Sequence, residues 1–196
     1  MTRSVSKNYI IFFIYISKMH FKNTLITYGI ISKNFHWIMA VIILLNFTIG
    51  VFMGDLEKGP LRFFLFNFHK SLGILILVLI IVRLLWRISN LVPNPLSENN
   101  LLNKTAKFVH YFFYFILLVV TFSGWTYSSA RGGPINVFGL FSVPALVEKN
   151  EEIGKIARNI HGISVYIFIT FLALHILASL YHHFFLKDKT LKRMWF

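Results

Sequence analysis

Residues 159–186 read NIHGISVYIFITFLALHILASLYHHFFL, a run without Asp, Glu, Lys or Arg. As a helix, it is long enough to cross the roughly 30 Å hydrocarbon core of a bilayer. His161 and His175 lie fourteen residues apart within it. On a helix, this spacing places them on nearly one face and about 21 Å apart along the axis. The run therefore predicts a membrane span that carries one imidazole near each face of the membrane.

The whole chain has the composition of a membrane protein. Of its 196 residues, 56% are hydrophobic and only 14% are charged, against roughly 25% in soluble domains. It has no Cys, which excludes disulfides, iron–sulfur clusters and haem attached through Cys, so a redox cofactor must be held by His or Met. The net charge of +13 comes from residues that flank apolar runs. There they indicate topology and contact with anionic lipid, and no nucleic acid is expected as a partner.

Three more apolar runs are long enough to span a bilayer. The four expected spans cover about residues 35–53, 63–86, 108–128 and 159–186. The connection between the second and third spans contains Pro93 and Pro95, which prevent a continuous helix there. The charged segment 148–158 is expected to form a surface helix, and we recognise no repeat. These features predict an all-α fold, an integral membrane four-helix bundle.

We expect one domain, residues 35–186, between a basic leader, 1–34, and a basic tail, 187–196. In the leader, residues 9–16 resemble the apolar part of a signal peptide but lack a small-residue cleavage site and are too short to span. They are either an interfacial segment or part of an upstream-start artefact, residues 1–18, with translation beginning at Met19. We favour the second interpretation.

Positive charge is divided unevenly between the two ends of these spans. If the N-terminus is inside, thirteen of the 20 Lys and Arg residues lie on the inner side and seven on the outer side, which also holds five of the seven acidic residues. Cytoplasmic loops of membrane proteins carry the excess of Lys and Arg. We therefore expect both the N- and C-termini to be cytoplasmic.

This orientation sorts the histidines by depth. His36 and His175 fall near the cytoplasmic face, and His69 and His161 near the outer face. Each pair joins two helices at one level, which is the ligand supply for two stacked bis-histidine haems. A single zinc site would need all four ligands in one cluster, which the 21 Å separation forbids. Ordinary interfacial histidines, or a proton relay without carboxylates, remain as alternatives.

Glycines near these histidines have two interpretations. Gly73 follows His69 by four residues and Gly162 adjoins His161. A glycine allows a flat macrocycle to approach a helix backbone, but it equally favours close helix–helix packing. Gly50 and Gly124 carry the same ambiguity.

Further polar residues lie at the cytoplasmic level. His110 and His182 could hydrogen-bond a quinone carbonyl or pass it a proton. The alternative is that His182 and its neighbour His183 are interfacial and only contact water. Arg83 and Arg87 lie where propionates of an inner haem could reach, or they snorkel to the interface.

A family resemblance is carried by Phe35-His36-Trp37, His69-Lys70-Ser71-Leu72-Gly73, Arg83-Leu84-Leu85-Trp86-Arg87, Val109-His110, Gly124-Trp125, Ser128-Ser129-Ala130, Ile160-His161-Gly162, His175, His182-His183-Phe184 and Lys187-Asp188. Over residues 35–194 the chain closely resembles the bacterial cytochrome b561 family of di-haem, four-helix membrane proteins. The resemblance implies a bacterial inner-membrane location. It also implies iron ligation of two haem b groups, by His36 with His175 and by His69 with His161.

The best-defined activity that the resemblance suggests is oxidation of superoxide at the periplasmic face with ubiquinone as acceptor near the inner haem. Lys70 and Arg158 adjoin the outer histidines and would attract an anion, whereas nearby glutamates weaken that field. The alternatives are a generic b-type electron carrier between the quinol pool and a redox partner, and a histidine-based proton or metal transporter without haem. A homodimer is compatible with any of them.

Overall fold

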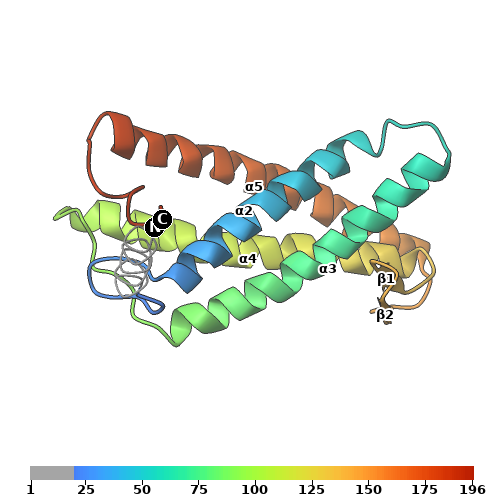
Figure 1. Ribbon diagram of the computed structural model, residues 1–196. Helices are drawn as coiled ribbons and strands as arrows, with labels where there is room; N and C mark the ends of the chain where they lie inside the picture. The colour runs from blue at the N-terminus through green and yellow to red at the C-terminus, as the bar shows by residue number, and fades with distance from the viewer. Residues whose placement is uncertain (1–19) are drawn as a thin grey trace, which may run out of the picture.

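Four long helices make up most of the computed structural model, which describes residues 20–196 (Figure 1). They are α2 (Ile30–Phe52), α3 (Pro60–Ile88), α4 (Asn100–Ala130) and α5 (Glu151–Phe184). Each is long and apolar enough to cross a membrane, so the four-span helical bundle is confirmed. The predictions for residues 9–16 and for translation from Met19 lie outside the described residues.

Two of the helices, α4 and α5, begin well before the predicted spans because polar residues cap their N-terminal ends. Asn99 accepts hydrogen bonds from Leu101 N and Leu102 N and so begins α4 well before residue 108. Asn150 accepts from Ile153 N at 3.0 Å and begins α5. Side chains of this type are favoured at helix N-caps because they satisfy free backbone N–H groups.

The charged segment 148–158 is not a separate surface helix, as we expected it to be. From Glu151 onward it is the first part of α5. Glu151 and Glu152 lie in the first turn, where negative charge is favourable at the positive end of the helix dipole. Lys155 pairs with Glu151 at 3.0 Å. Nothing between this turn and His161 breaks the helix, so one continuous element carries charge outside the membrane and apolar residues within it.

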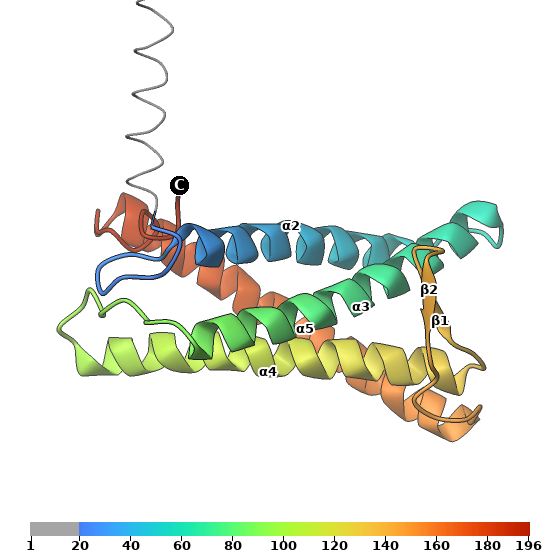
Figure 2. The same ribbon diagram turned by 60° about the horizontal axis from the view of Figure 1, so that its bottom comes forward.

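The helices run alternately in opposite directions, and the loops gather at two ends of the bundle (Figures 1 and 2). One end, called here the loop end, holds the first described residues, the α3–α4 connection and the C-terminus. Hydrogen bonds tie these segments together: Asn23 Nδ2 donates to Leu91 O at 2.7 Å, and Arg193 Nη1 donates to Asn94 O at 2.6 Å. Trp37 Nε1 of α2 donates to Met194 O at 2.8 Å. The other end, called the hairpin end, holds the α2–α3 turn and the α4–α5 connection.

The α4–α5 connection contains a β-hairpin that the sequence analysis did not predict. Strand β1 (Ile135–Val137) pairs antiparallel with β2 (Phe141–Val143). The turn between them uses left-handed backbone at Phe138 (φ 52°) and Gly139 (φ 76°). The strands are short because they connect two spans at the rim of the bundle, where backbone groups can also reach water.

The hairpin packs on α3 directly beside the first outer histidine. Ile135 and Val137 are buried against Ile74. The Ser71 hydroxyl accepts from Phe138 N and donates to Asn136 O, both at 3.1 Å. The hairpin therefore covers the helix turn that carries His69.

An apolar layer fills the middle of the bundle. Its buried side chains come from all four helices: Met39, Ile76, Ile80, Ile116, Leu117 and Phe168. Most other large apolar side chains face outward and are exposed. In a membrane these outward side chains contact lipid, and the central layer separates the polar groups at the two ends.

Before α2 the chain doubles back on itself. Ile30 N donates to His20 O at 3.0 Å, and Gly29 N donates to Asn23 Oδ1 at 2.9 Å. A Cβ at Gly29 would collide with backbone atoms of Phe21 and Lys22. Only glycine fits this crossing.

Replacing Gly29 with Ala should therefore destabilise the protein by about 1–3 kcal/mol, the usual cost of an unrelieved steric clash. The change is measured as a lower midpoint of thermal unfolding in detergent. Gly54→Ala is the control, because a Cβ there meets nothing within 4 Å. Equal midpoints of thermal unfolding for the two variants would contradict the close approach of Gly29 to the backbone of Phe21 and Lys22.

Candidate functional site

At the hairpin end, the imidazoles of His69 on α3 and His161 on α5 face each other. Their ring centroids are 6.3 Å apart and the ring planes meet at 84°. Two imidazoles that bind one metal from opposite sides have centres roughly 6 Å apart, because each metal–nitrogen bond is about 2.0 Å and each ring centre lies about 1 Å behind its nitrogen. The separation suits one metal between the two rings.

Both rings are oriented by backbone carbonyls. His69 Nδ1 lies 3.0 Å from Asn46 O, and His161 Nδ1 lies 2.8 Å from Val120 O. A carbonyl oxygen only accepts hydrogen bonds, so each Nδ1 carries the proton and each Nε2 keeps its lone pair. This is the tautomer that binds a metal through Nε2, with the Nδ1–H held by an outer partner.

A glycine makes each of these carbonyls accessible. Gly50 follows Asn46 by four residues, and Gly124 follows Val120 by four. In an α-helix the carbonyl of residue i points at residue i+4, so a side chain there would cover it. A Cβ on Gly50 would lie 3.0 Å from His69 Cε1, and one on Gly124 would lie 3.0 Å from His161 Nδ1. These two glycines therefore make room for the imidazoles.

Gly73 and Gly162 differ from them. A Cβ added at either meets nothing within 4 Å. Open space thus lies beside the helix turns that carry His69 and His161. A flat group bound between the rings has room there.

At the loop end, three histidines come together. The centroid of the His175 ring lies 6.4 Å from that of His36 and 6.3 Å from that of His110. The sequence analysis paired His175 with His36 and gave His110 a quinone role. In the structure both rings lie within metal-bridging distance of His175, one from α2 and one from α4.

Arg83 of α3 completes this inner cluster. Its Nη2 donates to His36 Nδ1 at 3.1 Å, its Nη1 to Met39 Sδ at 3.9 Å, and its guanidinium lies 5.9 Å from the centre of the Tyr114 ring. Arg87 lies one turn further along, over Tyr111, and its buried Nε has no hydrogen-bond partner among residues 20–196. Two cationic groups therefore lie within the loop-end half of the bundle.

The same spacing recurs in all four helices, although the sequence analysis recognised no repeat. Fourteen residues separate His36 from Gly50 on α2 and His110 from Gly124 on α4; fourteen also separate His69 from Arg83 on α3 and His161 from His175 on α5. The pair α2–α3 thus matches the pair α4–α5. When helices α2 and α3 are matched with α4 and α5, Arg83 on α3 corresponds in position to His175 on α5.

His182, the other residue expected near a quinone, orders the C-terminal tail. Its Nδ1 lies 2.5 Å from Asp188 Oδ2, and Thr190 N donates to Asp188 Oδ1 at 2.7 Å. Burial raises the pKa of Asp188, but the hydrogen bonds from His182 and Thr190 outweigh it and hold that pKa below its usual value. The His182 ring contacts Tyr181 rather than the inner histidines.

No cluster of three or more His, Cys, Asp or Glu residues that could hold a metal occurs in residues 20–196. A metal bound by protein side chains alone needs at least three such ligands. The hairpin end supplies two histidines, and at the loop end His36 and His110 each form one opposed pair with His175. This donor set fits a metal whose other ligands come from a macrocycle, so the residues present fit haem.

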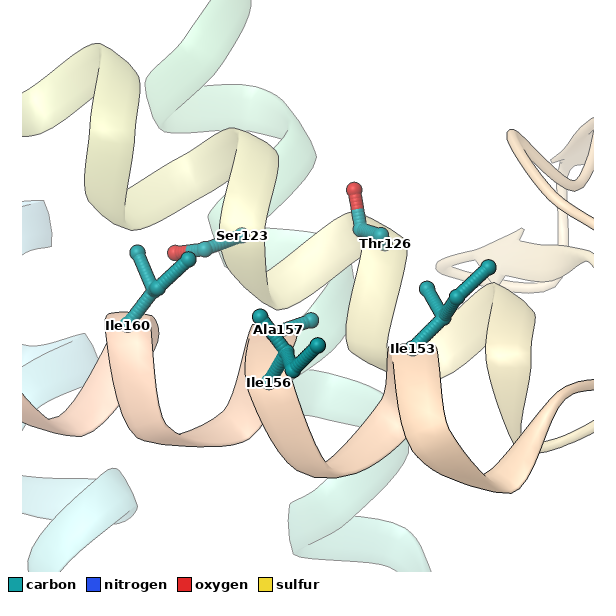
Figure 3. Close-up of a pocket in the computed structure, with 6 residues that line it drawn as sticks. All are labelled: Ser123, Thr126, Ile153, Ile156, Ala157 and Ile160. Atoms are coloured by element: carbon teal, nitrogen blue, oxygen red, sulfur yellow. The ribbon is translucent and has the colours of Figure 1, made fainter.

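A surface groove of about 190 Å³ lies between α4 and α5 near the hairpin end (Figure 3). It is lined mainly by apolar side chains: Ile153, Ile156, Ala157, Ile160, Ser123 and Thr126. The two hydroxyls donate to carbonyls of their own helix. The groove offers hydrocarbon contact and no charged side chain lines it.

The described geometry agrees with the relatives of the chain. Residues 27–196 match the family described as prokaryotic cytochrome b561. The chain belongs to this family. It is 35% identical over 184 residues to cytochrome b561 homolog 2 of Escherichia coli K12, covering 90% of this chain and 95% of the relative. It is 29% identical over 164 residues to cytochrome b561 homolog 1 of the same organism, covering 81% and 91%.

A further relative is the probable superoxide oxidase CybB of Yersinia pestis, 26% identical over 171 residues, covering 85% of this chain and 94% of the relative. The resemblance to the b561 family is therefore confirmed. Together with the four spans, family membership identifies a multi-pass protein of the bacterial inner membrane. It also identifies a haem b protein of membrane electron transfer.

The contact between glycine and imidazole predicts a selective loss of haem. Gly124→Ala places a methyl group against the His161 ring, and Gly50→Ala does so against His69. Each should lower haem content per chain by removing the hairpin-end haem, measured by the pyridine haemochrome assay. Gly154→Ala on α5 is the matched control, because its Cβ would make only an ordinary 3.5 Å contact with Ala130. Full haem content in all three would show that the rings do not need these glycines.

The inner cluster allows a second test. With His36 as partner of His175, His36→Ala and His175→Ala should each remove the loop-end haem and leave the hairpin-end one in the reduced-minus-oxidised spectrum. His110→Ala should retain both. Loss of a haem from His110→Ala with both retained in His36→Ala would instead assign His110 as the ligand.

Proposed function

We propose that the chain holds two haem b groups and moves electrons from superoxide, at the hairpin end, to ubiquinone, at the loop end. His69 and His161 hold the outer haem, and His36 and His175 the inner one. The observation that carries the proposal is the occurrence of two opposed imidazole pairs at opposite ends of one bundle, each at 6.3–6.4 Å between ring centres. Haem when bound supplies reversible one-electron transfer.

The orientation in the membrane is part of this proposal. The first described residues and the C-terminus lie at the same end of the bundle, joined through Trp37 and Met194. Under the positive-inside rule this end, which holds ten of the 17 Lys and Arg residues that lie within residues 20–196, faces the cytoplasm. The hairpin end then faces the periplasm.

The protein contributes three things to the reaction. Two imidazoles would hold the iron of each haem, and a haem held in this way would favour electron transfer over oxygen binding. The central apolar layer around Ile80 and Phe168 excludes water and ions between the two levels. Superoxide is an anion that does not cross hydrocarbon, so its oxidation belongs at the surface where it is produced.

The charges at the hairpin end bear on the capture of superoxide. Lys70 follows the ligand His69 and is partly exposed. Arg158 lies on the exposed first part of α5. Glu151 and Lys155 form an ion pair, so their opposite charges cancel and the pair adds nothing to the net field. A net positive field near the outer histidines would raise the encounter rate with an anion.

The loop end offers a place for the acceptor. An apolar groove of about 400 Å³ is lined by Asn34, Trp37, Ile38, Val41, Ile42 and Phe196. The Trp37 ring contacts the His36 ring edge-on, with 5.2 Å between centroids. A membrane quinone in this groove would lie one aromatic ring away from the inner histidines. Overall, two superoxide anions lose one electron each to become oxygen, and ubiquinone takes both electrons and two protons to become ubiquinol.

The generic electron carrier is the second candidate. It is favoured by the identity of 35% to cytochrome b561 homolog 2, above the 26% to the probable superoxide oxidase. It needs the same two haems and no superoxide capture. The haem-free transporter, in contrast, predicts no b-type spectrum.

A superoxide pulse separates these candidates. In vesicles that contain the haem-loaded protein and ubiquinone, the pulse should reduce haem and then form ubiquinol. Lys70→Gln should slow haem reduction severalfold, more at low than at high ionic strength, because the effect is electrostatic. Lys33→Gln, at the other end, is the control and should leave the rate unchanged. Haem that stays oxidised after the pulse but is reduced by a quinol would favour the generic carrier.

A further inference from the structure

The two histidine clusters differ in what lies behind the imidazoles. A histidine that donates its Nδ1–H to a carbonyl becomes a stronger electron donor to its metal. A stronger donor stabilises the oxidised metal and lowers its reduction potential. A fixed cation beside the site has the opposite effect, because reduction removes one positive charge from its neighbourhood.

At the hairpin end both ligand candidates have the first kind of partner. His69 donates to Asn46 O at 3.0 Å and His161 donates to Val120 O at 2.8 Å. The apolar residues Ile74, Ile135 and Val137 pack nearby under the hairpin. The nearest cation along α3, Lys70, is partly exposed, so solvent and salt screen its charge.

At the loop end the partner is a cation. Arg83 Nη2 donates to His36 Nδ1, and no backbone carbonyl accepts from His36, His110 or His175 within residues 20–196. When His36 binds a metal through Nε2 its Nδ1 is protonated and no longer accepts this hydrogen bond, so Arg83 then acts on the site through its charge alone. Arg83 forms no ion pair within the described chain, where the two such pairs are Lys155–Glu151 and His182–Asp188.

The correspondence between the helix pairs leads to the same conclusion. Arg83 lies fourteen residues after His69, as His175 lies fourteen after His161. The hairpin-end level therefore has matched histidines, His69 and His161, from the two halves. At the loop end the corresponding position holds His175 in one half and a permanent cation, Arg83, in the other. Arg87 adds a second charge of the same sign. Asp188, a carboxylate of the tail at this end, is already paired with His182.

We propose that Arg83, together with the absence of carbonyl partners at the loop end, raises the reduction potential of the inner haem above that of the outer haem. Electrons then run downhill from the hairpin end to the loop end. This inference rests on the proposed two-haem function and adds to it the difference in reduction potential that drives electrons in the proposed direction. Arg83 is a positioning residue and not a ligand, because its positive charge acts on the iron through the electrostatic field.

The test is an equilibrium redox titration of the purified, haem-loaded full chain, followed by absorbance. His161→Ala leaves the inner haem alone and His175→Ala leaves the outer haem alone, so the two potentials can be assigned without touching Arg83. The inner potential should be the higher one. Equal potentials, or a higher outer potential, would overturn the proposal.

A second set of variants tests the role of the guanidinium. Made in the His161→Ala protein, Arg83→Gln should shift the remaining potential downward, and Arg83→Lys, which keeps the charge, should shift it much less. Arg62→Gln is the matched control on the same helix, because Arg62 donates to Leu56 O at the far end and should leave the potential unchanged. An unchanged reduction potential in Arg83→Gln would contradict the role of Arg83. If that variant loses haem, the comparison of the two single-haem proteins still decides which haem has the higher potential.

These outcomes are distinct from a failure of the proposed function. A purified chain with one haem, or with none, would contradict the two-haem function itself. Two haems with the opposite order of potentials would leave the sites in place and contradict only the direction.

Discussion

The hydrogen bond between an imidazole Nδ1–H and a helix carbonyl is the interaction on which the hairpin-end site depends. A buried imidazole in a membrane needs a polar partner, and helices leave few free, because their carbonyls are already bonded within the helix. A carbonyl oxygen has a second lone pair. Asn46 O and Val120 O can use theirs because the residue four positions later, Gly50 or Gly124, has no side chain. One small residue on each neighbouring helix thus fixes the tautomer, the ring orientation and the free Nε2.

The need for a carbonyl partner agrees with the way histidines and glycines are arranged along the helices. α5 carries one histidine at each level, and α2 and α4 each present a histidine at the loop end and a carbonyl with its glycine at the hairpin end. The central layer around Ile80 keeps the two levels apart. Within residues 20–196 the histidines of the loop end have no carbonyl partners and have Arg83 instead, so the two sites differ in their electrostatics although they share one geometry. In the proposed two-haem function, this difference in electrostatics makes the reduction potentials of the two haems unequal. Unequal potentials give electron flow a preferred direction although the two ring pairs have the same geometry.

Much of this was visible in the sequence, because apolar length and the depth of each histidine are one-dimensional properties. The four spans, and the levels of His36, His69, His161 and His175, follow from them. The helix ends did not, since span length reports the thickness of the membrane, whereas Asn99 and Asn150 begin α4 and α5 outside it. The hairpin at 135–143 was missed because its two strands are only three residues each. Depth alone also could not tell which of His36 and His110 faces His175, since both lie at one level on different helices. The recurring fourteen-residue spacing was present in the sequence, but its meaning depends on which helices are neighbours.

The central claim is that each opposed imidazole pair encloses one iron. Locating iron by its anomalous X-ray scattering in crystals of the haem-loaded protein tests this most directly. The account predicts two iron peaks in each chain, one between His69 and His161 and one between His36 and His175. A single peak, or a peak away from either pair, would contradict it.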